Sequence, residues 1–215
     1  TARNYLAAVD ATTGALDTSW NPNANSDVNT LSVSGGKVYV GGQFTSLGGT
    51  ARNYLAAVDA TTGALDTWNP NANFYVRALA VSGGKVYVGG YFSSLGGTAR
   101  NYLAAVDATT GALDPSWNPN ASGGVTSLSV SGGKVYVGGG FTSMAGTTRN
   151  YLAAVDATTG VLDTSWNPNA NNYVNTLAVS GGKVYVGGNF TSLGGTARNR
   201  LAAVDATTGT LDPSW

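Results

Sequence analysis

Aspartate carries the main capacity for acid–base chemistry in this sequence, because histidine, cysteine and glutamate are all absent. All the aspartates except Asp27 fall in two repeated sets, one like Asp10, before an Ala-Thr-Thr-Gly stretch, and one like Asp17, after it. Acid–base hydrolysis needs two carboxyl groups in different environments, so that one is the acid and the other the base. Equivalent repeated copies do not provide this difference. We therefore expect no catalytic residue and no enzyme activity.

The same stretch, DATTGALD at Asp10–Asp17, offers calcium the oxygen atoms of Asp10, Thr12 and Asp17. It lacks the second Asp or Asn and the closing Glu of a calcium loop. An aspartate at the start of a turn accepts hydrogen bonds from nearby backbone N–H groups instead. The favoured interpretation is a structural turn, and we expect no metal and no cofactor.

Two other recurring polar or aromatic residue types have a structural interpretation. The arginine of each Ala-Arg-Asn-type stretch is expected to pair with a repeated aspartate between strands. The five tryptophans are expected to pack between neighbouring sheets, where a large ring buries most area.

These residues belong to an internal repeat that covers the whole chain. The stretch ARNYLAAVDATTGALD at Ala2–Asp17 returns twice unchanged and twice with small changes. Its arginines give spacings of 49, 48, 49 and 49 residues: Arg3, Arg52, Arg100, Arg149 and Arg198. Between these copies the segment GGKVYVGG occurs four times, the first at Gly35–Gly42. A repeat of this length indicates a stacked or circular array of small units.

Each unit reads as four short strands. In the first full repeat we expect strands at Val28–Ser34, Lys37–Phe44, Tyr54–Asp59 and about Ala64–Trp68, with a Gly-Gly hairpin turn between the first two. A Gly-rich connection, Thr45–Thr50, separates the second strand from the third. Gly interrupts the chain so often that no helix of useful length is expected.

Four strands per repeat, with apolar residues on both faces, indicate a β-propeller blade, since blades are covered on both sides by their neighbours. Gly41 and Gly42 would allow the close approach of backbones where blades converge. The fold class expected is all-β, a propeller of four-stranded antiparallel blades. A parallel β-solenoid is the alternative, but its coils lack tight two-residue hairpins.

The stretch Leu16–Gly63, with its LDTSW, NPN, SGGK, VGGQFT and RN segments, resembles the delta-60 repeat of bacterial β-propellers. Gly36-Lys37 stands where that family has a DGK-type turn, and Trp20 replaces its phenylalanine. The segment AVDATTG also resembles the PQQ-type quinoprotein repeat, although Trp20 lies further from Gly14 than that repeat requires. The first resemblance implies a propeller without implying an activity, and the second leaves a quinone-dependent oxidoreductase as a distant alternative.

The units do not add up to a closed ring. We expect one domain with a half-blade at 1–22 and blades at about 28–68, 76–117, 125–166 and 174–215. Three arrangements fit this inventory. The chain is a segment of a larger propeller with five blades, or a second copy completes the ring as a homo-oligomer, or the leading half pairs with the last blade.

The four full repeats differ at three places: the loop before the first strand, the second residue of that strand, and the residue after VYVGG. The Gly-Gly turn predicts that Val33 faces Val38, that Leu31 faces Val40 and that Val28 faces Gln43. The differing residues then gather at one rim of the propeller near its axis. They are Asp27, Asn29, Gln43, Phe74, Tyr75, Arg77, Tyr91, Thr126, Asn172, Tyr173, Asn175 and Asn189.

Neutral drift of exposed loops explains such differences without any function. The alternative is a binding rim, because Tyr, Phe, Arg and Asn are suited to recognition. On that interpretation the chain is a non-catalytic binding or scaffold module for a protein or surface ligand. A lectin-like site for a glycan is the second candidate, since aromatic rings stack on sugars and Asn and Gln hydrogen-bond them.

Composition limits the partners further. The net charge of zero gives no electrostatic reason to expect nucleic acid. No stretch approaches the roughly 20 apolar residues of a membrane span. The absence of Cys and Glu, with abundant Gly, Thr, Asn and Ser, favours an extracellular or cell-surface location.

Overall fold

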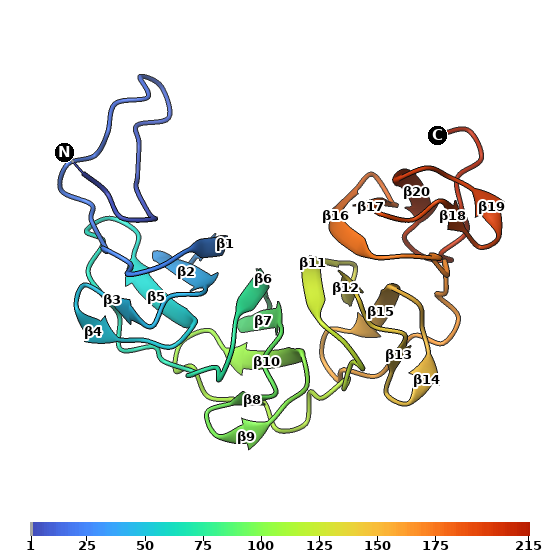
Figure 1. The fold of residues 1–215 in the computed structure, drawn as a ribbon, viewed down its shortest axis with the longest axis horizontal. Coiled ribbons are helices and arrows are strands. Elements are labelled where there is room, and N and C mark those ends of the chain that lie inside the picture. Colours follow the sequence, from blue (N-terminus) through green and yellow to red (C-terminus); the bar gives the residue numbers. More distant parts are fainter. Residues whose placement is uncertain (1) are drawn as a thin grey trace.

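The computed structural model of the chain describes residues 2–215, and in that range it contains strands and turns but no helix. Figure 1 shows four similar units side by side along an open arc, with the two chain ends on opposite sides of the opening. Each unit is a small antiparallel sheet, which we call a blade. The expected all-β architecture of propeller blades is confirmed.

In blade 1 the strand order is β1 (Val28–Ser34), β2 (Lys37–Gly42), β5 (Leu55–Asp59). A bridge between Val58 and Leu65 adds a short fourth strand. The first strands of neighbouring blades contact one another, so they lie innermost. The same order recurs in blade 2 (β6 Val76–Ser82, β7 Lys85–Gly90, β10 Leu103–Asp107), blade 3 (β11 Val125–Ser131, β12 Lys134–Gly139, β15 Leu152–Asp156) and blade 4 (β16 Val174–Ser180, β17 Lys183–Gly188, β20 Leu201–Asp205).

The Gly-rich connection contains a two-stranded hairpin that the sequence did not predict. In blade 1 it joins β3 (Ser46–Leu47) to β4 (Thr50–Ala51). Its glycines, Gly48 and Gly49, have φ of 56° and 79°, the left-handed region that a tight turn requires. The equivalents are β8 (Ser94–Leu95) with β9 (Thr98–Ala99), β13 (Ser143–Met144) with β14 (Thr147–Thr148), and β18 (Ser192–Leu193) with β19 (Thr196–Ala197).

The predicted register of the main hairpin is correct near the turn and wrong at its far end. Val33 lies opposite Val38 and Leu31 opposite Val40, as expected, but Val28 faces Gly42 instead of Gln43. A β-bulge between Val28 and Thr30 takes up the extra residue. The bulge recurs in every blade, so β2 and its copies end at the second glycine.

Neighbouring blades interlock through a glycine and a valine. A Cβ atom on Gly41 would lie 2.5 Å from Val76 Cγ1 of the next blade. That distance is far below any real contact, so only glycine fits, as the sequence predicted. The third strand, Leu55–Val58, is fully buried on both faces. Blades therefore cover each other as expected of a propeller.

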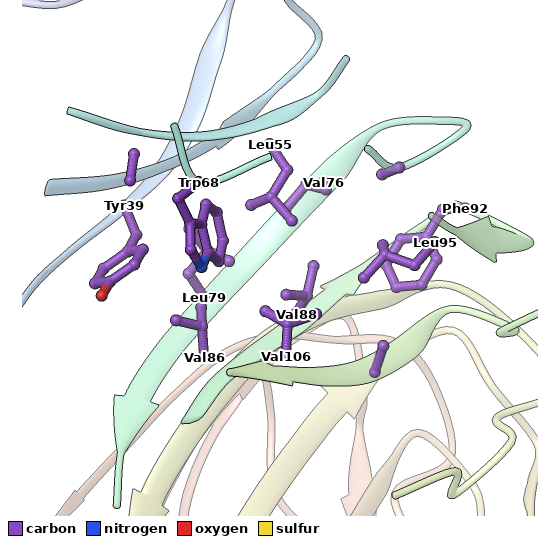
Figure 2. Close-up of a cluster of buried hydrophobic side chains, with 13 residues drawn as sticks. Tyr39, Leu55, Trp68, Val76, Leu79, Val86, Val88, Phe92, Leu95 and Val106 are labelled. Atoms are coloured by element: carbon purple, nitrogen blue, oxygen red, sulfur yellow. The ribbon is translucent and has the colours of Figure 1, made fainter. Parts of the chain in front are cut away.

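Tyrosine and tryptophan complete each interface between blades. Figure 2 shows Tyr39 of blade 1 beside Trp68, within the cluster of buried side chains between blades 1 and 2. The Tyr39 hydroxyl donates to the Ala108 carbonyl at 2.7 Å, and the Trp68 indole donates to the Asp107 carbonyl at 2.9 Å. The predicted packing of tryptophan between sheets is confirmed. The repeat of Trp68 is one residue shorter than the others, but the turn after Asp66 takes up the deletion, so Trp68 keeps this position. The Trp68 amide donates to the Asp66 carboxylate across the shorter turn.

The predicted pairing of arginine with aspartate is wrong. Arg52 donates to the backbone carbonyls of Ala51 and Asp66 at 2.9 Å each, and the carboxylate of Asp66 pairs with Lys37 at 3.0 Å. The Arg52 guanidinium thus supplies donors to two backbone carbonyls that have no strand partner on that side. Lysine reaches the carboxylate from the hairpin turn because its chain is long and flexible.

Residues 2–20 form what we call the leading half-blade. Val9 bridges to Leu16, as Val58 does to Leu65, but no first and second strands accompany this pair. Trp20 and Leu6 pack into blade 1. Thr1, with which the predicted half-blade 1–22 begins, lies outside the described residues.

Candidate binding rim

The differing residues of the repeats meet at one end of each main hairpin, as the sequence predicted. The amide of Gln43 donates to the Asp27 carbonyl at 2.8 Å, and the amide of Tyr91 donates to the Tyr75 carbonyl at 2.9 Å. The same bond joins Gly140 to Gly124 and Asn189 to Tyr173, at 2.8 Å each. The bulge holds the loop before the first strand directly over the end of the second. We call this surface the rim.

Three large side chains are exposed on the rim of blades 2 and 4. The exposed fractions are 43% for Phe74, 44% for Tyr91 and 48% for Tyr173. Aromatic rings are usually buried, and they dominate the energy of interfaces when they are not. The rim therefore offers apolar contact area with polar tips.

The rim of blade 3 is built from small residues that make room for these rings. A Cβ atom on Gly124 would lie 2.3 Å from Cε1 of Tyr91, and one on Gly140 would lie 2.4 Å from Cε1 of Tyr173. The tyrosines of blades 2 and 4 thus lean over the glycines of blade 3 from both sides. Large and small residues are matched across the blades.

Two tyrosines of the constant repeat join the rim, and sequence reasoning missed them. Tyr54 lies 5.7 Å from Tyr75 between ring centroids, and Phe74 stacks on Tyr75 at 4.1 Å. Tyr151 lies 5.6 Å from Tyr173. The three places compared between the repeats did not include this position, which is tyrosine in four copies and Arg200 in the last. Tyr54 has φ of 63°, a costly value for an aromatic residue. Its carbonyl accepts from the Gly42 amide at the end of β2, and its amide donates to the Phe44 carbonyl.

The polar rim residues form five separate groups. Arg77 donates to the Asn29 side chain at 3.3 Å, and Asn29 donates to the Val76 carbonyl at 3.4 Å. Asn175 donates to Asn189 at 3.2 Å. The remaining contacts join Gln43 to the Asp27 carboxylate, Thr126 to the Val174 carbonyl, and Asn172 to the Tyr173 amide. The sequence-predicted set is thus brought to one rim, but it does not converge on one centre.

The repeated aspartates lie away from this rim and are already committed to hydrogen bonds. The Asp59 carboxylate accepts the Thr62 amide at 2.7 Å and the Thr61 amide at 2.9 Å. These bonds lower the pKa of Asp59, with the Thr62 amide as the largest cause. The Asp10-type carboxylate is therefore a turn-forming anion, as predicted.

The Asp17-type set behaves in the same way. Burial raises the pKa of Asp163, but hydrogen bonds from Lys134 and from the Ser165 hydroxyl and amide outweigh it and lower the pKa to about 2. Within residues 2–215 no three acidic side chains gather as metal ligands would. The chemistry that the geometry supports is contact and hydrogen bonding at the rim.

Repeated four-stranded blades arranged around an arc, interlocked at glycine and joined by the same turns, define a β-propeller type of repeat protein. A PQQ-repeat family described as outer membrane protein assembly factor BamB matches residues 2–211. The chain therefore belongs to this family. The weaker of the two sequence resemblances, to PQQ-type repeats, is the one that this match supports.

Solved structures share the fold at low sequence identity. The chain is similar to the computationally designed protein Ika8 (TM-score 0.59, 19% identity, 93% of this chain and 52% of that one). It is similar to the WD40 β-propeller domain of Doa1 (0.57, 16%, 81% and 51%) and to a chain of the mitotic checkpoint complex (0.64, 15%, 94% and 55%). The chain spans about half the length of these structures. No curated protein matches the chain.

The described part of the chain, residues 2–215, has no helix with the length and apolar character needed to cross a membrane.

Proposed function

We propose that this chain is a non-catalytic binding module that holds a protein ligand at the rim, with Phe74, Tyr91 and Tyr173 as the main contacts. The observation that carries the proposal is the match between Tyr91, Tyr173 and the glycines of blade 3. Random drift of loops has no reason to put a large ring and a glycine opposite each other twice. Such matching sets the position of exposed rings, as a recognition surface needs.

The comparisons support this proposal at the level of class. The family description names an assembly factor, and two of the similar structures are a WD40 propeller domain and a chain of a multiprotein checkpoint complex. A role as a protein-interaction scaffold agrees with all three. The delta-60 resemblance and a cell-surface location belong to the same proposal.

The proposal that the chain lacks catalysis rests on the carboxylates. The repeated aspartates described above accept backbone N–H bonds, which hold their pKa below the usual range. A general acid at neutral pH needs the opposite shift.

The test is the selection of a random 12-residue peptide library on the immobilised chain, followed by affinity measurement with the enriched peptides. Truncating two anchors typically costs more than 2 kcal/mol, so Tyr91→Ala combined with Tyr173→Ala should weaken binding by about thirtyfold or more. Val161→Ala is the matched control, because Val161 is 65% exposed but lies on a turn away from the rim. Enriched peptides that bind the rim variant as well as the parent chain would contradict the proposal, as would failure of any peptide to enrich.

A carbohydrate ligand is the second candidate, favoured by exposed rings beside the Asn175 and Asn189 amides. A glycan array probed with the parent chain and with a Tyr75→Ala, Tyr91→Ala variant tests it. Sugar binding that both proteins share equally would remove the rim from consideration.

A further inference from the structure

A groove with a volume of about 460 Å³ lies between the leading half-blade and β1 of blade 1. Its lining is mixed, with polar and apolar surface in equal measure. It consists of Tyr5, Leu6 and Ala7 from the half-blade and Val28, Asn29, Thr30 and Leu31 from β1. Leu31 is 49% exposed here, whereas the equivalent Leu79 between blades 1 and 2 is 8% exposed.

One wall of this groove is an unpaired strand edge. Asp10 donates to the Ala15 carbonyl at 2.8 Å, and the Ala8 carbonyl accepts from Asp17 at 3.0 Å, so these residues point their backbone groups toward the outer segment. Backbone groups alternate along a strand, which turns those of Ala7 and Val9 to the opposite side. Among residues 2–215 no backbone carbonyl accepts a hydrogen bond from the Ala7 or Val9 amide. An edge of this kind is a template for another strand.

In each full blade the same space holds the second strand. In blade 1 it is β2, which pairs antiparallel with β5 so that Lys37 faces Asp59, Tyr39 faces Ala57 and Gly41 faces Leu55. Gly41 also takes the valine of the next blade, as described above. Four copies of this strand in the chain therefore show what fills the space: an extended Lys-Val-Tyr-Val-Gly-Gly strand. In three of them the first glycine also contacts the valine of the following blade.

We propose that the groove binds a further β-hairpin of this type by strand addition. Its second strand runs antiparallel to Leu6–Asp10, with its lysine opposite Asp10, its tyrosine opposite Ala8 and its first VYVGG glycine opposite Leu6 and against Val28. Its tyrosine hydroxyl donates to the Ala60 carbonyl. This carbonyl is the equivalent of the Ala108 carbonyl, which accepts from the Tyr39 hydroxyl. The hairpin's first strand then completes the inner side of the half-blade.

The occupant must bring a second strand with a free edge. A folded second copy of this chain does not offer one, because β2, β7, β12 and β17 are each paired on both sides. A hairpin not yet part of a blade meets the requirement. Strand addition of this kind draws its affinity from main-chain hydrogen bonds and its specificity from alternate side chains.

The probe is a synthetic peptide with the sequence of Val174–Phe190, VNTLAVSGGKVYVGGNF, labelled for fluorescence anisotropy. We expect saturable binding to the 215-residue chain. The peptide with Gly187→Val should bind at least about tenfold more weakly, because its new side chain meets Val28 where glycine is required. A peptide of reversed sequence controls for composition.

Two variants of the chain test the groove without touching its folded core. Leu31→Ser removes an exposed apolar wall and should weaken binding by about tenfold, a loss of about 1.4 kcal/mol. Val161→Ser is the matched control at an exposed valine far from the groove, and should bind as the parent does.

Hydrogen exchange gives a readout of register. Bound peptide should protect the amides of Ala7 and Val9, and leave the already bonded amide of Asp10 unchanged. The proposal is overturned if no saturable binding occurs up to about 1 mM peptide. It is equally overturned if the reversed or Gly187→Val peptide binds as well as the original, if Leu31→Ser has no effect, or if protection appears elsewhere.

Discussion

Leu103 and Leu201 occupy equivalent positions in blades 2 and 4, yet one is fully buried and the other is 57% exposed. Leu103 packs in the interface with blade 3, among Tyr87, Trp117 and Val125. Truncating a fully buried leucine to alanine removes its transfer free energy and leaves a cavity, which together cost about 2–5 kcal/mol. For Leu201, less than half of the side chain leaves water on folding, so the same change should cost no more than about 1 kcal/mol.

The pair is a controlled experiment, because both leucines begin an LAAVD strand that pairs in the same register with a KVYVGG strand of its own blade. Urea unfolding followed by tryptophan fluorescence measures the free energy of unfolding of each variant. With a slope of about 2–3 kcal/mol per molar urea, Leu103→Ala should lower the midpoint by about 1–2 M and Leu201→Ala by no more than about 0.5 M. Equal losses in the two variants would refute the reasoning, since burial between blades would then contribute nothing beyond burial within a blade.

Three further outcomes follow from the same contacts. Tyr87→Phe removes the hydroxyl that donates to the next blade at 2.8 Å and should cost about 1 kcal/mol in urea unfolding; Tyr185→Phe, whose hydroxyl has no acceptor among residues 2–215, should cost nothing measurable. The pKa of Asp163 is lowered to about 2 in the folded chain, so its stabilisation is present above about pH 4 and is lost as pH falls toward 2; acid titration of unfolding should show this loss, and Asp163→Asn should remove its share. Gly140→Ala should displace the ring of Tyr173, visible as lost nuclear Overhauser contacts, while changing stability by less than about 1 kcal/mol because an exposed ring rotates easily.

The blade itself could be predicted from the sequence because its signals are local and repeated. The Gly35-Gly36 turn fixes the hairpin, and Val33 and Val38 meet as predicted. The register predicted for the far end of the hairpin was wrong because a β-bulge lies there. A bulge depends on how the strand meets its neighbour, and no residue type marks it. The ion pair of Lys37 with Asp66 was not predicted, for a similar reason. The two residues are 29 positions apart, so the geometry of the fold decides that they meet. Arginine and lysine carry the same charge, so the sequence does not show which of them pairs with the aspartate.

The rim could be predicted in position but not in content. Counting back from the turn brings the differing residues to one end of each hairpin, whichever register holds there. The contact of the Tyr91 ring with Gly124 could not be predicted, because it joins two blades. One of these blades has a large residue at the rim and the other has a small one. Tyr54 escaped notice since its role at the rim arises from φ of 63°, a backbone value that the letters ARNY do not reveal.

Gly124 and Gly140, which lie against Tyr91 and Tyr173, make the sequence of blades along the chain matter, although the framework of every blade is nearly identical. Exchanging blades 3 and 4 would keep every buried strand and every Gly–Val interlock, but it would place Tyr91 beside Tyr173 with no space for either ring. Shuffled arrays of these modules should therefore fold alike and yet present different outer chemistry, which makes module order a heritable variable in its own right.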